Sequence, residues 1–126
     1  MVSGARIVLD CAGGFIALGG LYDLATPALP ANLSAVCGAN APSARLVREL
    51  LRALGGSLIA IGIAVVALAN VASLRNQGFT PWLVLMLVLP SEGVNAFGMY
   101  RAGSPFVIPL AFIAVTVAGA AIALIG

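Results

Sequence analysis

The segment 53-ALGGSLIAIGIAVVALANVASL-74 contains no charged residue along its whole length. Gly and Ala are spread through a background of Leu, Ile and Val. A helix needs about 20 mostly apolar residues to cross the hydrocarbon core of a bilayer. This stretch therefore predicts a membrane-spanning helix, which we place at about 45–73.

Three other apolar runs are long enough to span a bilayer, at about 4–24, 80–100 and 104–125. Asp10 interrupts the run at about 4–24, which argues against a cleaved signal peptide there. Glu92 interrupts the run at about 80–100. We therefore predict an all-α chain in which residues 1–126 form a single domain, an integral membrane four-helix antiparallel bundle.

Another charge-free stretch, at about 25–43, has a different composition. It contains Pro27, Pro30 and Pro42 together with several Asn, Ser and Gly residues. Such residues leave backbone groups unpaired, which lipid does not tolerate. We expect an ordered loop here that joins the first two spans. Hydroxyl groups are predicted to cap the later helices at Ser43, Thr80 and Ser104.

The composition excludes several classes of protein. Hydrophobic residues make up 62%, charged residues 8%, and the mean hydropathy is +1.15. A soluble domain is about 45–50% apolar and about 25% charged, so a soluble globular domain, a disordered chain and a nucleic-acid binder do not fit. The expected partners are membrane lipid and a hydrophobic small molecule. Arg without Lys, in a chain rich in Ala, Gly and Val, suggests a bacterial source, and hence a multi-pass protein of the inner membrane.

Metal and cofactor chemistry have little support. The chain has no His, the commonest metal ligand and general base. Its two cysteines, Cys11 and Cys37, cannot form a four-ligand site, and we favour two free thiols over a disulfide. We expect no metal and no cofactor.

Polar residues gather toward one side of the predicted bundle. In an up-and-down bundle, the 25–43 loop and the turn after residue 101 lie on the same side of the membrane. The residues predicted near that side are Tyr22, Asp23, Arg45, Arg48, Glu49, Arg52, Glu92, Asn95, Tyr100 and Arg101.

Depth distinguishes Arg52 and Glu92 from the rest of that group. At a rise of 1.5 Å per residue, both lie about 10–13 Å below the interface. An unpaired charge at that depth costs at least about 2–3 kcal/mol, so we expect the two side chains to face each other or a common cavity. Glu92, Asn95 and Met99 share one helix face.

Several of these residues also have a purely structural interpretation. Arg45, Arg48 and Arg101 suit interface anchors whose charged ends reach water. Asp23 suits the end of a span, and Arg6 with Asp10 suits a structural ion pair. Glu92 is the hardest to explain in this way, because an ionisable residue within a span indicates a functional site by default.

Carboxylate acid–base chemistry is the remaining catalytic hypothesis. Glu92 would act as a general acid, and Glu49 as an ionised partner, with Asp23 and Asp10 as alternates. Arg52 would hold one carboxylate charged. The other candidate substrate-binding residues are Asn95, Tyr100, Tyr22 and Arg48. The set suits cyclisation, isomerisation or epoxide opening of a terpenoid or polyketide, with the Pro-rich loop covering the pocket.

Two other functions stay open. The chain has the size of a small proton-coupled transporter, although Arg residues at the same mouth would repel a cationic substrate. An accessory subunit of a larger membrane complex is the third hypothesis. Small residues around Gly119 favour packing within the bundle, with a homo-oligomer seam as the alternative.

The segment 49-ELLRALGGSLIAIG-62 resembles a family of small four-helix bacterial membrane proteins of unknown function. Members commonly show an acidic residue, Arg-Ala and Gly-Gly at the head of the second helix, as Glu49, Arg52 and Gly55 do here with their neighbours. The resemblance implies four helices and marks Glu49 and Arg52, but it implies no reaction.

Overall fold

The computed structural model describes residues 3–26, 28–75 and 78–125, except for the side chains of 72–75. The described residues form five helices and no strand: α1 (Ser3–Ala25), α2 (Ala31–Cys37), α3 (Ala41–Arg75), α4 (Thr80–Arg101) and α5 (Val107–Ile125). All but α2 are long and apolar enough to cross a membrane. The prediction of an all-helical chain with four such segments is confirmed.

The region predicted as a loop at 25–43 contains α2 and the first turn of α3. The backbone N–H groups of Leu33 and Ser34 both donate to the carbonyl of Pro30, which starts α2. Gly38 ends it with φ of +54°, a conformation that favours glycine. Pro27, also part of that prediction, lies outside the described residues.

The predicted hydroxyl caps are wrong at all three sites. At α3, the Asn40 side chain accepts the N–H of Ser43 at 3.2 Å, so Ser43 receives the cap instead of supplying it. At α4, no side chain caps the helix at Phe79, and Thr80 is buried as its first residue. Ser104 lies before α5, which begins only at Val107.

Ser104 instead closes the end of α4. Its N–H donates to the carbonyl of Met99 at 2.9 Å, and the N–H of Gly103 donates to that of Tyr100 at 3.2 Å. Gly103 has φ of +68°. This pair of bonds is a Schellman motif, which satisfies the last carbonyls of the helix and turns the chain sharply into α5.

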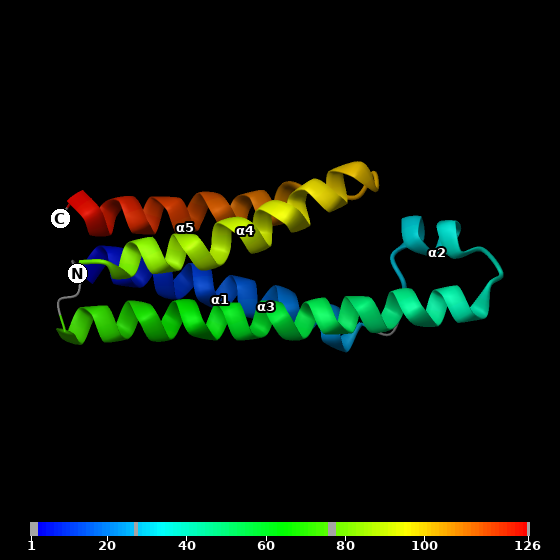
Figure 1. Ribbon diagram of the computed structural model, residues 1–126, viewed down its shortest axis with the longest axis horizontal. Coiled ribbons are helices and arrows are strands. Elements are labelled where there is room, and N and C mark those ends of the chain that lie inside the picture. The colour runs from blue at the N-terminus through cyan, green and yellow to red at the C-terminus, as the bar shows by residue number, and fades with distance from the viewer. Residues whose placement is uncertain (1–2, 27, 76–77, 126) are drawn as a thin grey trace.

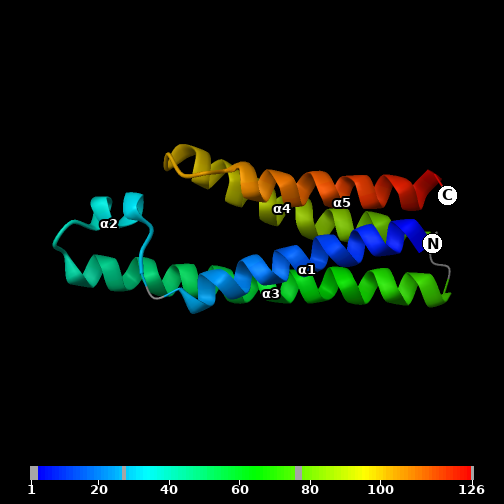
Figure 2. The ribbon, with the colours of Figure 1, turned by 180° about the vertical axis from the view of Figure 1, so that it is seen from behind.

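The four long helices lie side by side. The start of α1 and the end of α5 lie at one end of the molecule, and the α4–α5 turn lies at the other (Figure 1). α1 packs on α3 and α5, while α4 packs on α5 and less extensively on α3. Toward the α4–α5 turn, α4 and α5 diverge from α3 (Figures 1 and 2).

α3 is the longest element and extends past the end of α1 (Figure 2). Its 35 residues span about 52 Å, well beyond the ~30 Å of a hydrocarbon core. α2 packs against this extension. Arg45, Arg48 and Glu49 lie on it, so the most charged part of the chain is outside the four-helix region.

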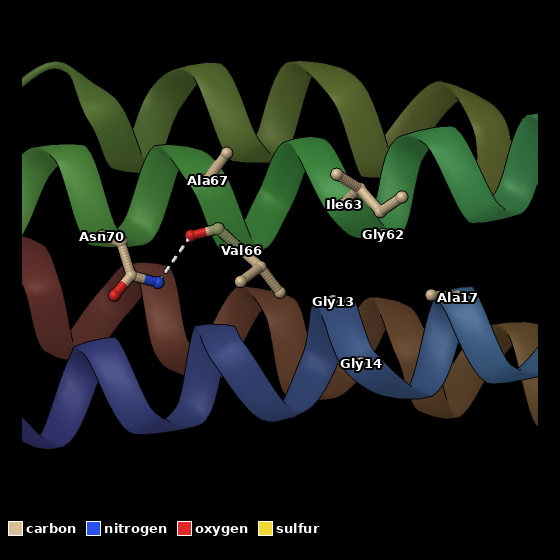
Figure 3. A pocket seen from close by; sticks show the side chains of 8 residues that line it. All are labelled: Gly13, Gly14, Ala17, Gly62, Ile63, Val66, Ala67 and Asn70. Atoms are coloured by element: carbon tan, nitrogen blue, oxygen red, sulfur yellow. Dashed lines mark hydrogen bonds between the residues drawn. The ribbon is translucent and has the colours of Figure 1, made fainter.

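Glycine pairs bring α1 and α3 into close contact. Gly13 faces Gly62, and Gly20 faces Gly55. The second pair lies seven residues after the first on α1 and seven residues before it on α3. A Cβ built on Gly13 would lie 2.7 Å from the Gly62 carbonyl oxygen, closer than real Cβ atoms come. Figure 3 shows this contact and the small residues of the groove beside it. Such residues let helix backbones approach in lipid, where close packing drives association.

The inner face of α4 carries one residue every turn. Thr80, Val84, Val88, Glu92 and Ala96 are buried at intervals of four. The valines join Leu9 and Ile16 of α1 and Val65 of α3 in the core.

Gly119 of α5 packs against Leu9 of α1, so this small residue serves contact within the chain.

The outer surface of the bundle is apolar. Phe15, Trp82 and Phe97 are more than half exposed, and Met86 is 74% exposed. Large apolar side chains are exposed along all four long helices. Soluble monomers rarely expose contiguous apolar patches beyond a few hundred Å². This surface is the kind that lipid covers.

Candidate functional site

A cavity of about 830 Å³ lies where α4 and α5 diverge from α3. Its size falls in the range of small-molecule sites. All five helices or their adjoining loops contribute to its wall: Gly19, Tyr22, Asp23, Pro30, Asn32, Leu33, Leu51, Leu54, Leu58, Val94, Asn95, Gly98, Met99, Ala102, Ser104, Pro105, Ile108, Pro109 and Phe112. Most of these side chains are apolar, and a few polar groups are set among them.

Asp23 is the carboxylate of this wall. It lies two residues before the end of α1 and is partly buried. It also lines a smaller cavity of about 280 Å³ bounded by Thr26, Ala28, Leu29 and Pro30, so it stands between the two spaces. Among the residues that the structure describes, no Arg lies within 4.0 Å of its carboxylate.

Glu92 lies on the inner face of α4, two residues after Pro90. Its side chain is 0% exposed. Oε2 accepts a long hydrogen bond of 3.4 Å from Nδ2 of Asn95, one turn further along. Oε1 has no hydrogen-bond partner among the described residues. Because buried polar atoms nearly always have partners, this oxygen marks Glu92 as a candidate functional group.

Asn95 connects Glu92 to the cavity. Asn95 lines the cavity wall, whereas Glu92 does not. The predicted grouping of Glu92, Asn95 and Met99 on one face is therefore partly confirmed: Asn95 and Met99 line the cavity, and Glu92 lies behind Asn95.

A side-chain hydrogen bond joins two parts of the cavity wall, α2 and the α4–α5 turn. Nδ2 of Asn32, in the first turn of α2, donates to Oγ of Ser104 in the α4–α5 turn. Both residues line the cavity. Apart from this bond, α2 contacts mainly α3, so the bond is its polar link to the diverging pair of helices.

The structure does not bring Arg52 and Glu49 to the cavity. They form an exposed pair with each other, with Nη1 of Arg52 3.0 Å from Oε1 of Glu49. Their side chains are 45% and 58% exposed. The expectation that Arg52 and Glu92 face each other or share this cavity is therefore wrong. The inner face of α3 at this level is occupied by Leu51, Leu54 and Leu58, which points Arg52 outward.

Two other candidates, Arg48 and Tyr100, also lie away from the cavity wall, whereas a third, Tyr22, is part of it. Arg48 is on the α3 extension, where its buried Nε has no partner among the described residues. Tyr100 is exposed and packs edge-on against Phe106, with ring centroids 5.4 Å apart. Tyr22 does line the wall, although much of its side chain is exposed.

Asp10 belongs to a separate polar cluster toward the start of α1. Its Oδ2 lies 3.6 Å from Nε of Arg6, so the expected ion pair is confirmed. Its Oδ1 accepts a 2.9 Å hydrogen bond from Nδ2 of Asn70 on α3. That amide also donates to the carbonyl of Val66, as Figure 3 shows. The cluster ties α1 to α3 and leaves Asp10 little freedom for chemistry.

Sequence reasoning missed Asn32 and Ser104. A polar residue in a Pro-rich segment and a serine after a helix both suit turns, and neither pattern indicates a contact across 72 residues. Within the described residues, no group of His, Cys, Asp and Glu side chains could hold a metal ion, and Cys11 and Cys37 are free thiols.

Comparison with known proteins finds no family model, no curated protein and no solved structure that matches the chain. The resemblance at the head of α3 to a family of small membrane proteins therefore stays a prediction.

Proposed function

We propose that the chain is an integral protein of the bacterial inner membrane, inserted as an antiparallel four-helix bundle. Four helices of spanning length and an apolar outer surface support this. The charged extension of α3 and α2 would then lie at the membrane surface. The large cavity would open near that surface, between lipid and water.

The cavity is proposed to be the active site of an acid–base enzyme that acts on a hydrophobic small molecule. The observation that carries this proposal is the unpartnered Oε1 of Glu92, fully buried behind the cavity wall. In either protonation state this atom needs a partner, and a substrate or water oxygen beside Asn95 would supply one.

In this mechanism Glu92 is the general acid and Asp23 is its ionised partner. Asp23 takes the place predicted from the sequence for Glu49. In an epoxide opening, Glu92 gives its proton to a water molecule beside Asn95, and that water gives a proton to the epoxide oxygen as the C–O bond breaks. An internal hydroxyl of the substrate attacks the carbon, and Asp23 accepts the proton that this hydroxyl loses. Cyclisation and isomerisation use the same two groups, one giving and one taking a proton.

The test compares wild type with Glu92→Gln and Asp23→Asn, each purified in detergent. The proteins are incubated with fractions of lipid extract and pathway intermediates from the source organism, and products are read by mass spectrometry. Glu49→Gln is the matched control, because it removes an exposed carboxylate outside the cavity. We expect conversion by wild type and the control, and a loss of about 10²-fold or more in the two cavity variants. Equal conversion by all four proteins would refute the assignment.

A proton-coupled transporter is the second candidate. The sequence-based argument against it is that Arg residues at the same mouth would repel a cationic substrate, but no Arg lines the described wall. A transporter would bind a ligand in the cavity without changing it chemically. Proton-driven uptake into proteoliposomes, abolished by Asp23→Asn, with no new product mass would favour transport over catalysis.

A further inference from the structure

The cavity wall has an unbalanced charge. Of the described residues that line it, Asp23 is the one with an ordinarily charged side chain. The other polar groups of the wall are neutral: two amides, one hydroxyl and the phenol of Tyr22. Glu92, directly behind the wall, adds a second carboxyl group. The site therefore has acidic groups and no counter-charge of its own.

The described arginines are occupied elsewhere or lie outside the wall. Arg6 pairs with Asp10, and Arg52 pairs with Glu49. The guanidinium of Arg101 lies 5.9 Å from the ring centre of Phe97 on the outer surface of α4. Arg45 and Arg48 are on the α3 extension, and neither lines the cavity. The sequence contains no Lys and no His.

A charge in such a site, near the surface of the protein, interacts with a partner more strongly than it would in bulk water. At an effective dielectric constant of 20, two unit charges 4 Å apart interact about four times more strongly than in bulk water. A cation beside Asp23 would supply the partner that no side chain supplies. An anion would meet two carboxyl groups and no positive group, so the site would reject it.

The rest of the wall favours a bulky apolar body. Leu54 and Leu58 of α3 face Ile108 and Phe112 of α5, and Met99 of α4 adds a flexible side chain. Hydrophobic and aromatic walls with a few placed polar groups are typical of small-molecule sites. Phe112 and Tyr22 also offer aromatic rings, whose faces attract cations.

We infer that the cavity takes a lipophilic cation, a molecule with a protonated amine or quaternary centre on a hydrophobic body, with its charge beside Asp23. This inference shares one element with the proposed function, namely that the cavity binds the ligand, and it does not depend on catalysis. It narrows the substrate class from hydrophobic molecules in general to hydrophobic cations.

The test uses two probes of the same size and shape, tetraphenylphosphonium and tetraphenylborate, which differ in the sign of their charge. Saturable binding of each radiolabelled probe is measured by equilibrium dialysis against the purified protein in a neutral detergent. We expect wild type to bind the cation at least about tenfold more tightly than the anion. Asp23→Asn should weaken cation binding by about tenfold or more, and Asp23→Glu should restore it. Glu49→Gln is the control and should bind as wild type does.

A cavity-filling variant provides a second test in case Asp23→Asn does not fold. Gly98 lines the cavity, and a Cβ added there meets nothing within 4 Å, so Gly98→Trp has room to enter the space. It should reduce cation binding while circular dichroism shows unchanged helix content.

Tighter binding of the anion, or unchanged cation binding in either Asp23→Asn or Gly98→Trp, would overturn the inference. Absence of saturable binding of both probes to folded wild type would refute the cavity as a ligand site, and with it both the inference and the proposed function. Cation binding that depends on Asp23, without conversion of any fraction, would support this inference and refute catalysis alone.

Discussion

Asn95 donates from Nδ2 to Oε2 of Glu92 across 3.4 Å, and this long bond is the hydrogen bond that the buried Glu92 carboxyl makes within the described part of the chain. Asn95 borders the cavity of about 830 Å³, and Glu92 does not. The Glu92 carboxyl group is thus separated from a ligand-sized cavity by Asn95, and its Oε1 has no hydrogen-bond partner among the described residues. Stability alone does not explain such an arrangement, because an unpaired buried polar atom is unfavourable.

Removing the Glu92 carboxyl group should stabilise the protein. Glu92→Leu replaces a buried, under-bonded polar group with an apolar one, and we expect the free energy of unfolding to rise by about 1–3 kcal/mol. Reversible unfolding by SDS in mixed micelles measures the change. Asp23→Leu, at a partly exposed site, is the comparison and should change stability less. A marked loss of stability in Glu92→Leu would show that the carboxyl group has partners that this structure lacks.

The Gly20–Gly55 contact should tolerate no side chain. A Cβ on Gly20 would overlap the carbonyl oxygen of Gly55 and lie 2.8 Å from the Ile59 nitrogen, so Gly20→Ala forces the helices apart. We expect a loss of about 1–3 kcal/mol in unfolding free energy.

Gly14→Ala is the matched control for that substitution, because it lies on the same helix and a Cβ there meets nothing within 4 Å. Its stability should stay the same or rise, since Ala has the higher helix propensity. If the two variants are equally stable in SDS titrations, α1 and α3 do not pack in this register.

The Asp10–Asn70 bond should contribute modestly to stability. Hydrogen bonds between membrane helices average about 0.6 kcal/mol in double-mutant cycles. We expect a coupling energy near that value between Asp10→Ala and Asn70→Ala, measured by SDS unfolding of the two single variants and the double variant. Arg6 allows a second cycle with Asp10, and its more exposed ion pair should give a smaller coupling. Strict additivity of Asp10→Ala and Asn70→Ala would contradict the bond.

The Asn32–Ser104 bond should slow ligand exchange. One hydrogen bond is worth about 1 kcal/mol, so Asn32→Ala should speed dissociation of tetraphenylphosphonium by about fivefold. Stopped-flow displacement measures the rate. Ser34→Ala is the control, since its hydroxyl donates to the Ala31 carbonyl within α2.

Hydrogen exchange gives an independent readout of the same bond. The amide groups of Leu33 and Ser34, which bond to Pro30 in the first turn of α2, should exchange faster in Asn32→Ala. Unchanged exchange and unchanged dissociation would show that this bond does not hold α2 against the α4–α5 turn.

The long helices could be predicted because their signal is local. An apolar run such as 53–74 can satisfy its backbone polar groups in lipid only as a helix, whatever its neighbours do. The Arg6–Asp10 pair was predictable for the same reason, since four residues along a helix place two side chains on one face. The predicted depth of the charges marked Glu92 together with Arg52.

The cavity could not be predicted, because it depends on how helices rotate and diverge. The sequence places Arg52 and Leu51 at the same depth, but only packing against α1 decides which one faces inward. That rotation turns Arg52 out to Glu49 and leaves Asp23 without a counter-charge. In the same way, Asn32 and Ser104 meet only because α4 and α5 diverge from α3.

The sequence by itself determined the helices and the position of each charge along them, because backbone hydrogen bonding and apolar composition act along the chain. Only the tertiary structure decided which of those charges share a cavity, since that depends on the rotation of each helix about its axis. The contact of Gly13 with Gly62 and of Gly20 with Gly55 fixes that rotation for α1 and α3.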